Sequence, residues 1–118
     1  MGTHKDLDVW QLSMEFVVDI YKMTKIFPSE EKYGLSSQMR RAAVSIPSNI
    51  AEGAARKNTK EFIQFLYYSL GSAAEIETQL ELSKRLNFVK NTDDIDKKLH
   101  SIIRMLVGLI KSLKNKLN

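Results

Sequence analysis

Seven apolar residues in the last quarter of the sequence recur at spacings of 4, 3, 4, 4, 3 and 4 positions. They are Ile95, Leu99, Ile102, Leu106, Ile110, Leu113 and Leu117. Side chains three and four positions apart share one face of an α-helix, whereas a half-buried strand needs alternation at every second residue. The spacing therefore predicts a long amphipathic helix, and Thr92, Asp93 and Asp94 favour its N-terminus. Such a helix must bury its apolar stripe against other helices.

Three further segments have helical periodicity, over residues 8–27, 36–53 and 59–86. The caps expected at their N-termini are Asp8, Ser36 or Ser37, and Asn58. The connections between the four segments are short, so neighbouring helices should be antiparallel. With 118 residues and no internal repeat, the sequence predicts an all-α, antiparallel up-down-up-down four-helix bundle, with residues 1–118 forming a single domain.

Pro47 lies inside the second predicted helix. The core periodicity nevertheless continues across it, from Leu35 to Ile50. A proline cannot donate to the carbonyl of Ala43 one turn earlier, and its ring crowds that turn. We therefore expect one continuous helix that is kinked at Pro47.

The composition excludes several functions. The chain has no cysteine, which rules out disulfides and cysteine-based zinc sites. His4 and His100 are its two histidines, and no Glu-x-x-His motif of a di-iron bundle is present. Phosphate-binding glycine loops and nucleophile elbows are also missing. We predict no catalytic residue, metal or cofactor, and we do not expect an enzyme. No run approaches ~18 apolar residues, so we expect no membrane span and a cytoplasmic location.

One face of the second predicted helix is polar in an organised way. Six residues at spacings of 3, 4, 4, 3 and 4 form this polar stripe: Gln38, Arg41, Ser45, Asn49, Glu52 and Arg56. A solvated flank is one interpretation. A binding surface is the other, because guanidinium and amide groups suit planar acceptors such as phosphate or carboxylate.

Five bases lie on the same helix and just after it, with Glu52 as the acid among them. These five basic residues are Arg40, Arg41, Arg56, Lys57 and Lys60. The net charge of +4 permits an anionic partner without requiring one. If RNA is bound, we expect these residues to contact its phosphates. Because no aromatic residue stands among them in the sequence, we expect no base stacking and little sequence discrimination.

The chain has more aromatic and apolar surface than one bundle core requires. Residues 62–68 of the third predicted helix are apolar or aromatic nearly all round the axis, and the first predicted helix has a second apolar stripe that includes Trp10. Single surface aromatics are ordinary, but contiguous ones indicate an interface. We predict a homo-oligomer with candidate interface residues Trp10, Phe65, Tyr67 and Tyr68.

Charge is separated between the third and fourth predicted helices. Residues 61–82 contain four acids and no base, and residues 97–118 contain six bases and no acid. The simpler expectation is that the two helices neutralise each other within one bundle. The alternative is a pair of complementary surfaces that steer one subunit onto the next.

An ordered set of short motifs resembles a known family. It includes Leu7–Gln11, Tyr33–Leu35, Gln38–Ala42 and Ser45–Gly53. Over about residues 6–90 the chain closely resembles the bacterial four-helix bundle proteins encoded in intervening sequences of 23S ribosomal RNA genes, which are often labelled ribosomal proteins. The resemblance implies a ring, typically a homopentamer.

The chain is also similar to the accessory variability protein of diversity-generating retroelements, a basic pentameric bundle that binds nucleic acid and a reverse transcriptase. Two functions follow as alternatives. One is an RNA-associated oligomeric bundle. The other is a protein-interaction scaffold whose ring binds a protein partner without contacting nucleic acid.

Overall fold

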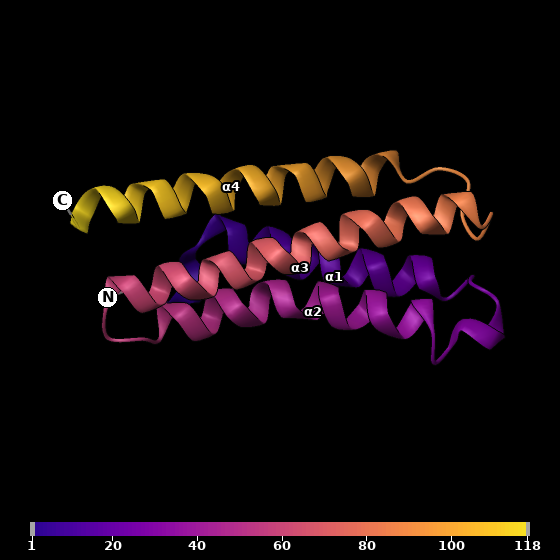
Figure 1. Cartoon of the computed structure of the whole chain (residues 1–118), viewed down its shortest axis with the longest axis horizontal. Coiled ribbons are helices and arrows are strands. Elements are labelled where there is room, and N and C mark those ends of the chain that lie inside the picture. The colour runs from indigo at the N-terminus through magenta and orange to yellow at the C-terminus, as the bar shows by residue number, and fades with distance from the viewer. Residues whose placement is uncertain (1, 118) are drawn as a thin grey trace.

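Four long helices lie side by side in the computed structural model, which describes residues 2–117 (Figure 1). They are α1 (Asp8–Thr24), α2 (Leu35–Ala54), α3 (Thr59–Arg85) and α4 (Asp93–Leu117), with short 3-10 helices η1 (His4–Asp6) and η2 (Ser29–Glu31). Successive helices run in opposite directions, and the described part of the chain contains no strand. The predicted antiparallel four-helix bundle is confirmed. It measures 48 × 22 × 20 Å.

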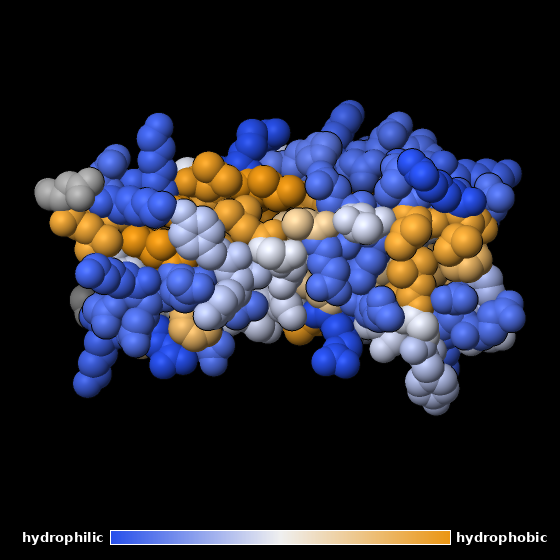
Figure 2. Space-filling model, in the orientation of Figure 1, coloured by the Kyte–Doolittle hydropathy of each residue, from blue (hydrophilic) through white to orange (hydrophobic). Residues whose placement is uncertain are grey.

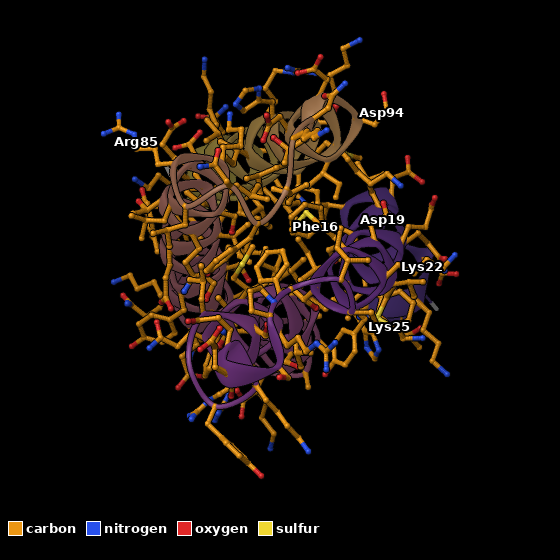
Figure 3. All side chains as sticks on the ribbon, turned by 90° about the vertical axis from the view of Figure 1, so that its right-hand side faces the viewer. Phe16, Asp19, Lys22, Lys25, Arg85 and Asp94 are labelled. Carbon is orange, nitrogen blue, oxygen red and sulfur yellow. The ribbon has the colours of Figure 1, made fainter. Side chains whose placement is uncertain are left out.

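All four helices contribute to a core along the bundle axis. Its largest fully buried side chains include Phe16, Ile20, Met39, Ile46, Leu66, Ile76, Leu99, Ile102 and Leu106. The view along the bundle shows Phe16 pointing into the space between the helices, while Lys22, Lys25 and Arg85 lie at the outside (Figure 3). The apolar stripe predicted for α4 is buried from Leu99 to Leu113, as its spacing requires.

The buried face of α3 differs from the apolar stripe that 3- and 4-residue spacing predicts for this segment, namely Phe62, Leu66, Leu70, Ala73, Ile76 and Leu80. Phe62 and Leu70 are only half buried, whereas Ile63 and the polar residue Ser69 are buried. The cause is the close packing of α3 on α2, which draws small polar residues into the contact. The hydroxyl of Ser69 donates a hydrogen bond to the carbonyl oxygen of Ile46 at 2.9 Å.

The N-terminal caps of α1 and α2 are not those predicted. Leu7, rather than Asp8, precedes α1, and its side chain makes no capping bond. Helix α2 begins at Leu35, whose backbone N–H donates to the Glu31 carboxylate at 3.1 Å. A carboxylate supplied by η2 therefore does what Ser36 or Ser37 was expected to do. The cap predicted for α3 is confirmed, since Asn58 Oδ1 accepts from the backbone of the third helical residue at 2.8 Å.

Helix α2 continues through Pro47 without interruption. The carbonyl of the preceding residue, Ile46, accepts the hydroxyl of Ser69 across the α2–α3 contact. This bond ties α3 to the turn of α2 that contains the proline, whereas the carbonyl that loses its N–H donor to Pro47 is that of Ala43. The continuous helix is as predicted, and the kink at the proline remains a prediction.

At Gly53, α3 packs closely on α2. A Cβ atom at this position would lie 2.7 Å from Cβ of Phe65 and 3.0 Å from Cδ1 of Phe62. Both distances are shorter than ordinary van der Waals contact. A residue without a side chain therefore lets the two helices pack closely just before the connection that joins them.

Candidate nucleic-acid interface

The polar stripe of α2 lies on the outside of the bundle. Its exposed members are Gln38, Arg41, Glu52 and Arg56, and its two central members are half buried. The Ser45 hydroxyl donates to the carbonyl of Arg41 at 3.0 Å, and the Asn49 amide donates to the carbonyl of Ser45 at 2.8 Å. The centre of the stripe therefore satisfies the backbone of its own helix. The exposed groups at its two ends remain available to a ligand.

Arg40 connects α2 to the end of α1. Its Nε donates to Thr24 Oγ1 at 2.8 Å, and its Nη2 donates to the Tyr21 carbonyl at 3.4 Å. The guanidinium carbon lies 4.6 Å from the centroid of the Tyr21 ring, which is cation–π geometry. Arg40 thus has a structural role that its neighbour Arg41 lacks, although the sequence placed both in one basic set.

An open groove of about 560 Å³ lies beside Arg41, over the first half of α2. It is lined by Tyr21, Lys32, Tyr33, Ser37, Arg40, Arg41, Val44 and Ser45. The two aromatic residues come from α1 and from the connection before α2, so the fold brings them to the arginines. The expectation that no aromatic residue accompanies the bases is therefore wrong for this groove. We call it the Tyr33 groove.

The other three bases lie at the opposite end of α2. Arg56 stacks on Phe65, with 4.8 Å between the guanidinium carbon and the ring centroid, and lies 3.9 Å from the Glu52 carboxylate. Lys57 and Lys60 are exposed where the chain turns into α3. We call Arg56, Lys57 and Lys60 the loop cluster. It lies about 22 Å from Arg41, at ~1.5 Å per residue along a helix. One subunit therefore presents two separate basic regions rather than one.

The bases of α4 do not neutralise the acids of α3. Within residues 2–117, no Lys or Arg of α4 forms an ion pair with an α3 carboxylate. Lys98 instead contacts Asp19 of α1 at 2.7 Å, and Lys114 Nζ donates to the Tyr67 hydroxyl at 2.6 Å. The hydrogen bond to Asp19 raises the pKa of Lys98. The expected mutual neutralisation through ion pairs between α3 and α4 is therefore wrong for the Lys and Arg residues of the described part of α4.

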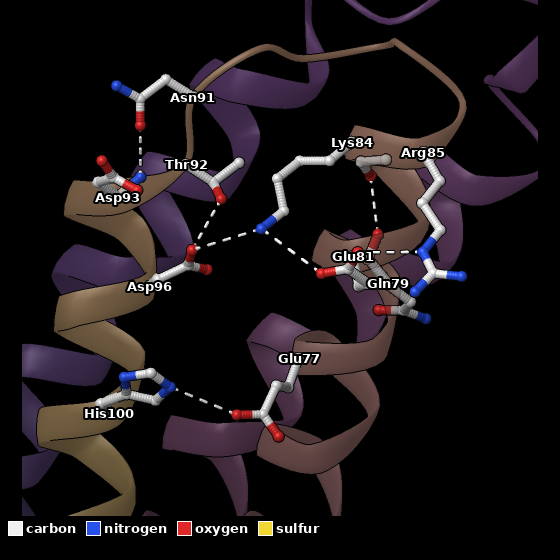
Figure 4. A network of polar contacts seen from close by, with 11 residues as sticks. Glu77, Gln79, Glu81, Lys84, Arg85, Asn91, Thr92, Asp93, Asp96 and His100 are labelled. Carbon is white, nitrogen blue, oxygen red and sulfur yellow. Dashed lines mark hydrogen bonds and ion pairs between the residues drawn. The ribbon is translucent and has the colours of Figure 1, made fainter.

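The acids near the end of α3 pair mainly within their own helix (Figure 4). Glu81 accepts from Arg85 at 3.1 Å and lies 3.5 Å from Lys84, and the Arg85 hydrogen bond is the main cause of the lowered pKa of Glu81. Across to α4, Glu77 lies 3.4 Å from His100. Further along α4, the basic residues Arg104, Lys111, Lys114 and Lys116 form no ion pair with any described residue.

The four candidate interface residues lie in three separate places on the bundle. Half-buried Trp10 lies beside α2, in an apolar groove of about 380 Å³. Phe65 lies under the Arg56 guanidinium and makes an edge contact with Tyr68, their centroids 5.4 Å apart. The hydroxyl of Tyr67 accepts a hydrogen bond from Lys114 of α4. They therefore do not form one continuous patch in a single subunit.

The described residues hold no cluster of metal ligands, and each of their two histidines has a separate neighbour. Among residues 2–117, no group of three or more His, Cys, Asp or Glu residues could hold a metal ion. The ring of His4 packs against Trp10 at 5.1 Å, and His100 is exposed beside Glu77. None of the helices in the described chain is long and apolar enough to cross a membrane.

Sequence reasoning missed three residues of the Tyr33 groove. Lys32 and Tyr33 belong to the connection before α2, and Tyr21 belongs to the second apolar stripe of α1. One feature of the sequence could have indicated Tyr33 as a site residue. It stands next to Gly34, at the start of a helix that carries two arginines. The sequence alone did not show that Tyr21 faces the same space.

The protein is a small antiparallel four-helix bundle. Its surface carries open grooves lined by basic and aromatic side chains. Residues 5–108 match the model of the family described as 23S rRNA-intervening sequence protein, and the chain belongs to this family. The resemblance inferred from the motifs is thereby confirmed, and it extends into α4. The family description does not name an enzyme activity.

A solved structure supports the same assignment. It is the crystal structure, at 1.70 Å resolution, of a protein with unknown function from the S23 ribosomal protein family of Bacteroides thetaiotaomicron. The two chains are 28% identical with a TM-score of 0.80, and the match covers 87% of this chain and 95% of the other. A search of curated proteins finds no match.

Proposed function

We propose that this protein is an RNA-associated bundle that works as a homo-oligomer. The observation that carries the proposal is a set of exposed basic side chains without counter-ions on α2, on the connection after it and in the first turn of α3. Arg41, Lys57 and Lys60 form no ion pair within the described chain. Among anionic partners we propose RNA, because the chain belongs to a family named for a ribosomal RNA intervening sequence.

Phosphate contact is the chemistry that these side chains offer. Guanidinium and ammonium groups neutralise phosphates and release condensed counter-ions, which gives affinity that weakens as salt increases. One subunit that makes only a few such contacts binds RNA weakly. An oligomer would repeat the two basic regions once per subunit and multiply the effect.

Exposed apolar side chains support the oligomer. On α1, Met14 is 42% exposed and Val18 is 52% exposed. Apolar residues line the groove between α1 and α2: Trp10, Met14, Val17, Val44, Pro47 and Ala51. Apolar side chains also gather along the face that α3 and α4 present in Figure 2. We propose that subunit contacts cover part of this surface, and that the ring is the pentamer implied by the family resemblance.

The salt dependence of RNA binding tests the proposal. Nuclease-treated protein is titrated into fluorescently labelled RNA, and anisotropy is measured from low to moderate salt. The variant Arg41→Ala/Lys57→Ala/Lys60→Ala should bind more weakly, and its slope of log affinity against log salt should be shallower by about 0.7–0.9 for each phosphate that is no longer neutralised. The control Lys22→Ala/Lys25→Ala/Lys90→Ala removes the same charge from other exposed positions and should keep the slope.

A protein-interaction scaffold is the second candidate, and the apolar groove around Trp10 favours it. If the wild-type protein shows no RNA affinity at low salt, the RNA proposal is overturned. The bases then belong to contacts with other subunits or with a protein partner. Sedimentation as a monomer at micromolar concentration would contradict the oligomer independently of either function.

A further inference from the structure

We propose that the Tyr33 groove binds an unpaired base of single-stranded RNA, with the Tyr33 ring as the stacking surface. This inference rests on the proposed RNA association and names the form of RNA that is bound. It also assigns a function to residues outside the five basic residues, namely Tyr21, Lys32 and Tyr33.

The exposure of Tyr33 is the first argument. Its side chain is 88% exposed, although other aromatic residues at this end, such as Phe27 and Phe88, pack against each other with centroids 5.4 Å apart. An aromatic ring that contributes nothing to the core is available to stack on a ligand. Every nucleobase offers a flat face to such a ring, so stacking requires no particular sequence.

The backbone that carries Tyr33 is well ordered by its own hydrogen bonds. The N–H of Lys32 donates to the Ser29 carbonyl at 3.1 Å, and the N–H of Gly34 donates to the Glu31 carbonyl at 3.0 Å. The ring is therefore presented from a bonded turn rather than from a loose loop. Less conformational entropy is lost on binding when the binding surface is already ordered.

The charges around the ring suit a nucleotide. Lys32 Nζ lies 5.6 Å from the Tyr33 ring centroid, and Arg41 is exposed on the groove wall. None of the lining residues is acidic. The nearest carboxylate along the chain, that of Glu31, already accepts from the first N–H of α2. Phosphates on either side of a stacked nucleobase would therefore meet the side chains of Lys32 and Arg41, and the nearest acids, Glu30 and Glu31, belong to η2 and do not line the groove.

Arg40 and Tyr21 form a fixed wall of the same groove. Their cation–π contact at 4.6 Å and the bond from Arg40 to Thr24 hold the guanidinium in place. Guanidinium planes and aromatic rings are the two surfaces on which proteins stack splayed-out RNA bases. The bases of a duplex are paired and stacked on each other, so only unpaired RNA can use this wall. The loop cluster has Arg56 over Phe65 but no ring as exposed as Tyr33, and it offers phosphate contacts alone.

The test compares single-stranded and duplex RNA of equal length. Labelled 12-nucleotide RNA and the matched duplex are titrated with wild type, Tyr33→Ala and Tyr33→Phe. Removal of one stacking ring should weaken single-strand binding by roughly 5- to 100-fold in Tyr33→Ala and change duplex binding little. Tyr33→Phe keeps the ring and should bind like wild type. Lys111→Ala, which changes an exposed base outside the groove, should also behave like wild type.

Each other result overturns the inference. If wild type binds RNA but Tyr33→Ala binds the single strand equally well, the groove is not used and the proposed RNA association stands. A Tyr33→Ala variant with an altered oligomeric state places the ring in a subunit contact. Polyglutamate is added as a competitor that has negative charge but no nucleobase. If it competes as well as unlabelled RNA, binding depends on charge alone and not on a stacked nucleobase. A wild-type protein that binds neither RNA overturns the groove and the proposed function together.

Discussion

Two adjacent arginines of α2 should respond very differently to the same substitution. Arg40→Ala removes a charged hydrogen bond to Thr24 and a cation–π contact with Tyr21. Arg41→Ala removes an exposed side chain whose charge has no partner within residues 2–117. We expect the first change to lower the free energy of unfolding and the second to leave it almost unchanged.

The magnitude follows from the contacts. A hydrogen bond from a charged donor contributes about 1.5–3 kcal/mol, and an exposed cation–π contact adds about 0.5–1 kcal/mol. Because Arg40 is only half buried, we expect a loss of about 1–3 kcal/mol. For Arg41, as for most exposed positions, the change should stay within about 0.5 kcal/mol.

Urea unfolding followed by circular dichroism at 222 nm measures both variants. With a slope of about 2 kcal/mol per molar urea, the midpoint of Arg40→Ala should fall by roughly 0.5–1.5 M. All proteins are compared at one concentration, because oligomerisation adds to apparent stability. Equal midpoints for the two variants would refute the structural role assigned to Arg40.

Three further predictions address the helix contacts, a pKa and the oligomer. Ser69→Ala removes a buried hydrogen bond from α3 to the Ile46 carbonyl, so the free energy of unfolding, measured in urea, should fall by about 0.5–1.5 kcal/mol. The pKa of Lys98 is raised by its pairing with Asp19, so the pairing stabilises the fold fully below the ordinary value of 10.5 and loses this effect as pH rises through the raised pKa. Asp19→Asn should therefore lower the unfolding midpoint at pH 8 and have a smaller effect as pH rises through the raised pKa of Lys98, and a pH-independent effect would contradict the pairing. Tyr68→Glu places a charge at a half-exposed ring, so sedimentation should show dissociation while the helical circular dichroism persists. Unchanged sedimentation would place the subunit contact elsewhere.

The helices could be predicted from the sequence because periodicity reports which residues face the core. The stripe of α4 and the continuous course of α2 through Pro47 required no tertiary information. The caps were harder to predict. Glu31 caps α2 from a 3-10 turn, and propensity favours serine at such a position without showing where a neighbouring carboxylate will lie.

The site could be predicted only in part, because side-chain partners are set by packing. The spacing placed Arg41 on an outer face correctly, but it could not distinguish Arg41 from Arg40, whose partner Thr24 is sixteen positions away. The Tyr33 groove forms when the connection before α2 folds back beside α1. The charge separation of α3 and α4 misled for the same reason, because sequence shows the sign of a charge but not the direction in which its side chain points.

Photo-crosslinking tests most directly whether RNA lies in the Tyr33 groove. Single-stranded RNA that contains 4-thiouridine is bound to the intact protein and irradiated, and the crosslinked tryptic peptides are identified by mass spectrometry. We predict a crosslink in the peptide of residues 33–40, which runs from Tyr33 to Arg40 between two trypsin sites. Crosslinks confined to α4 or to the α2–α3 connection, or none above a polyglutamate-competed background, would contradict the account.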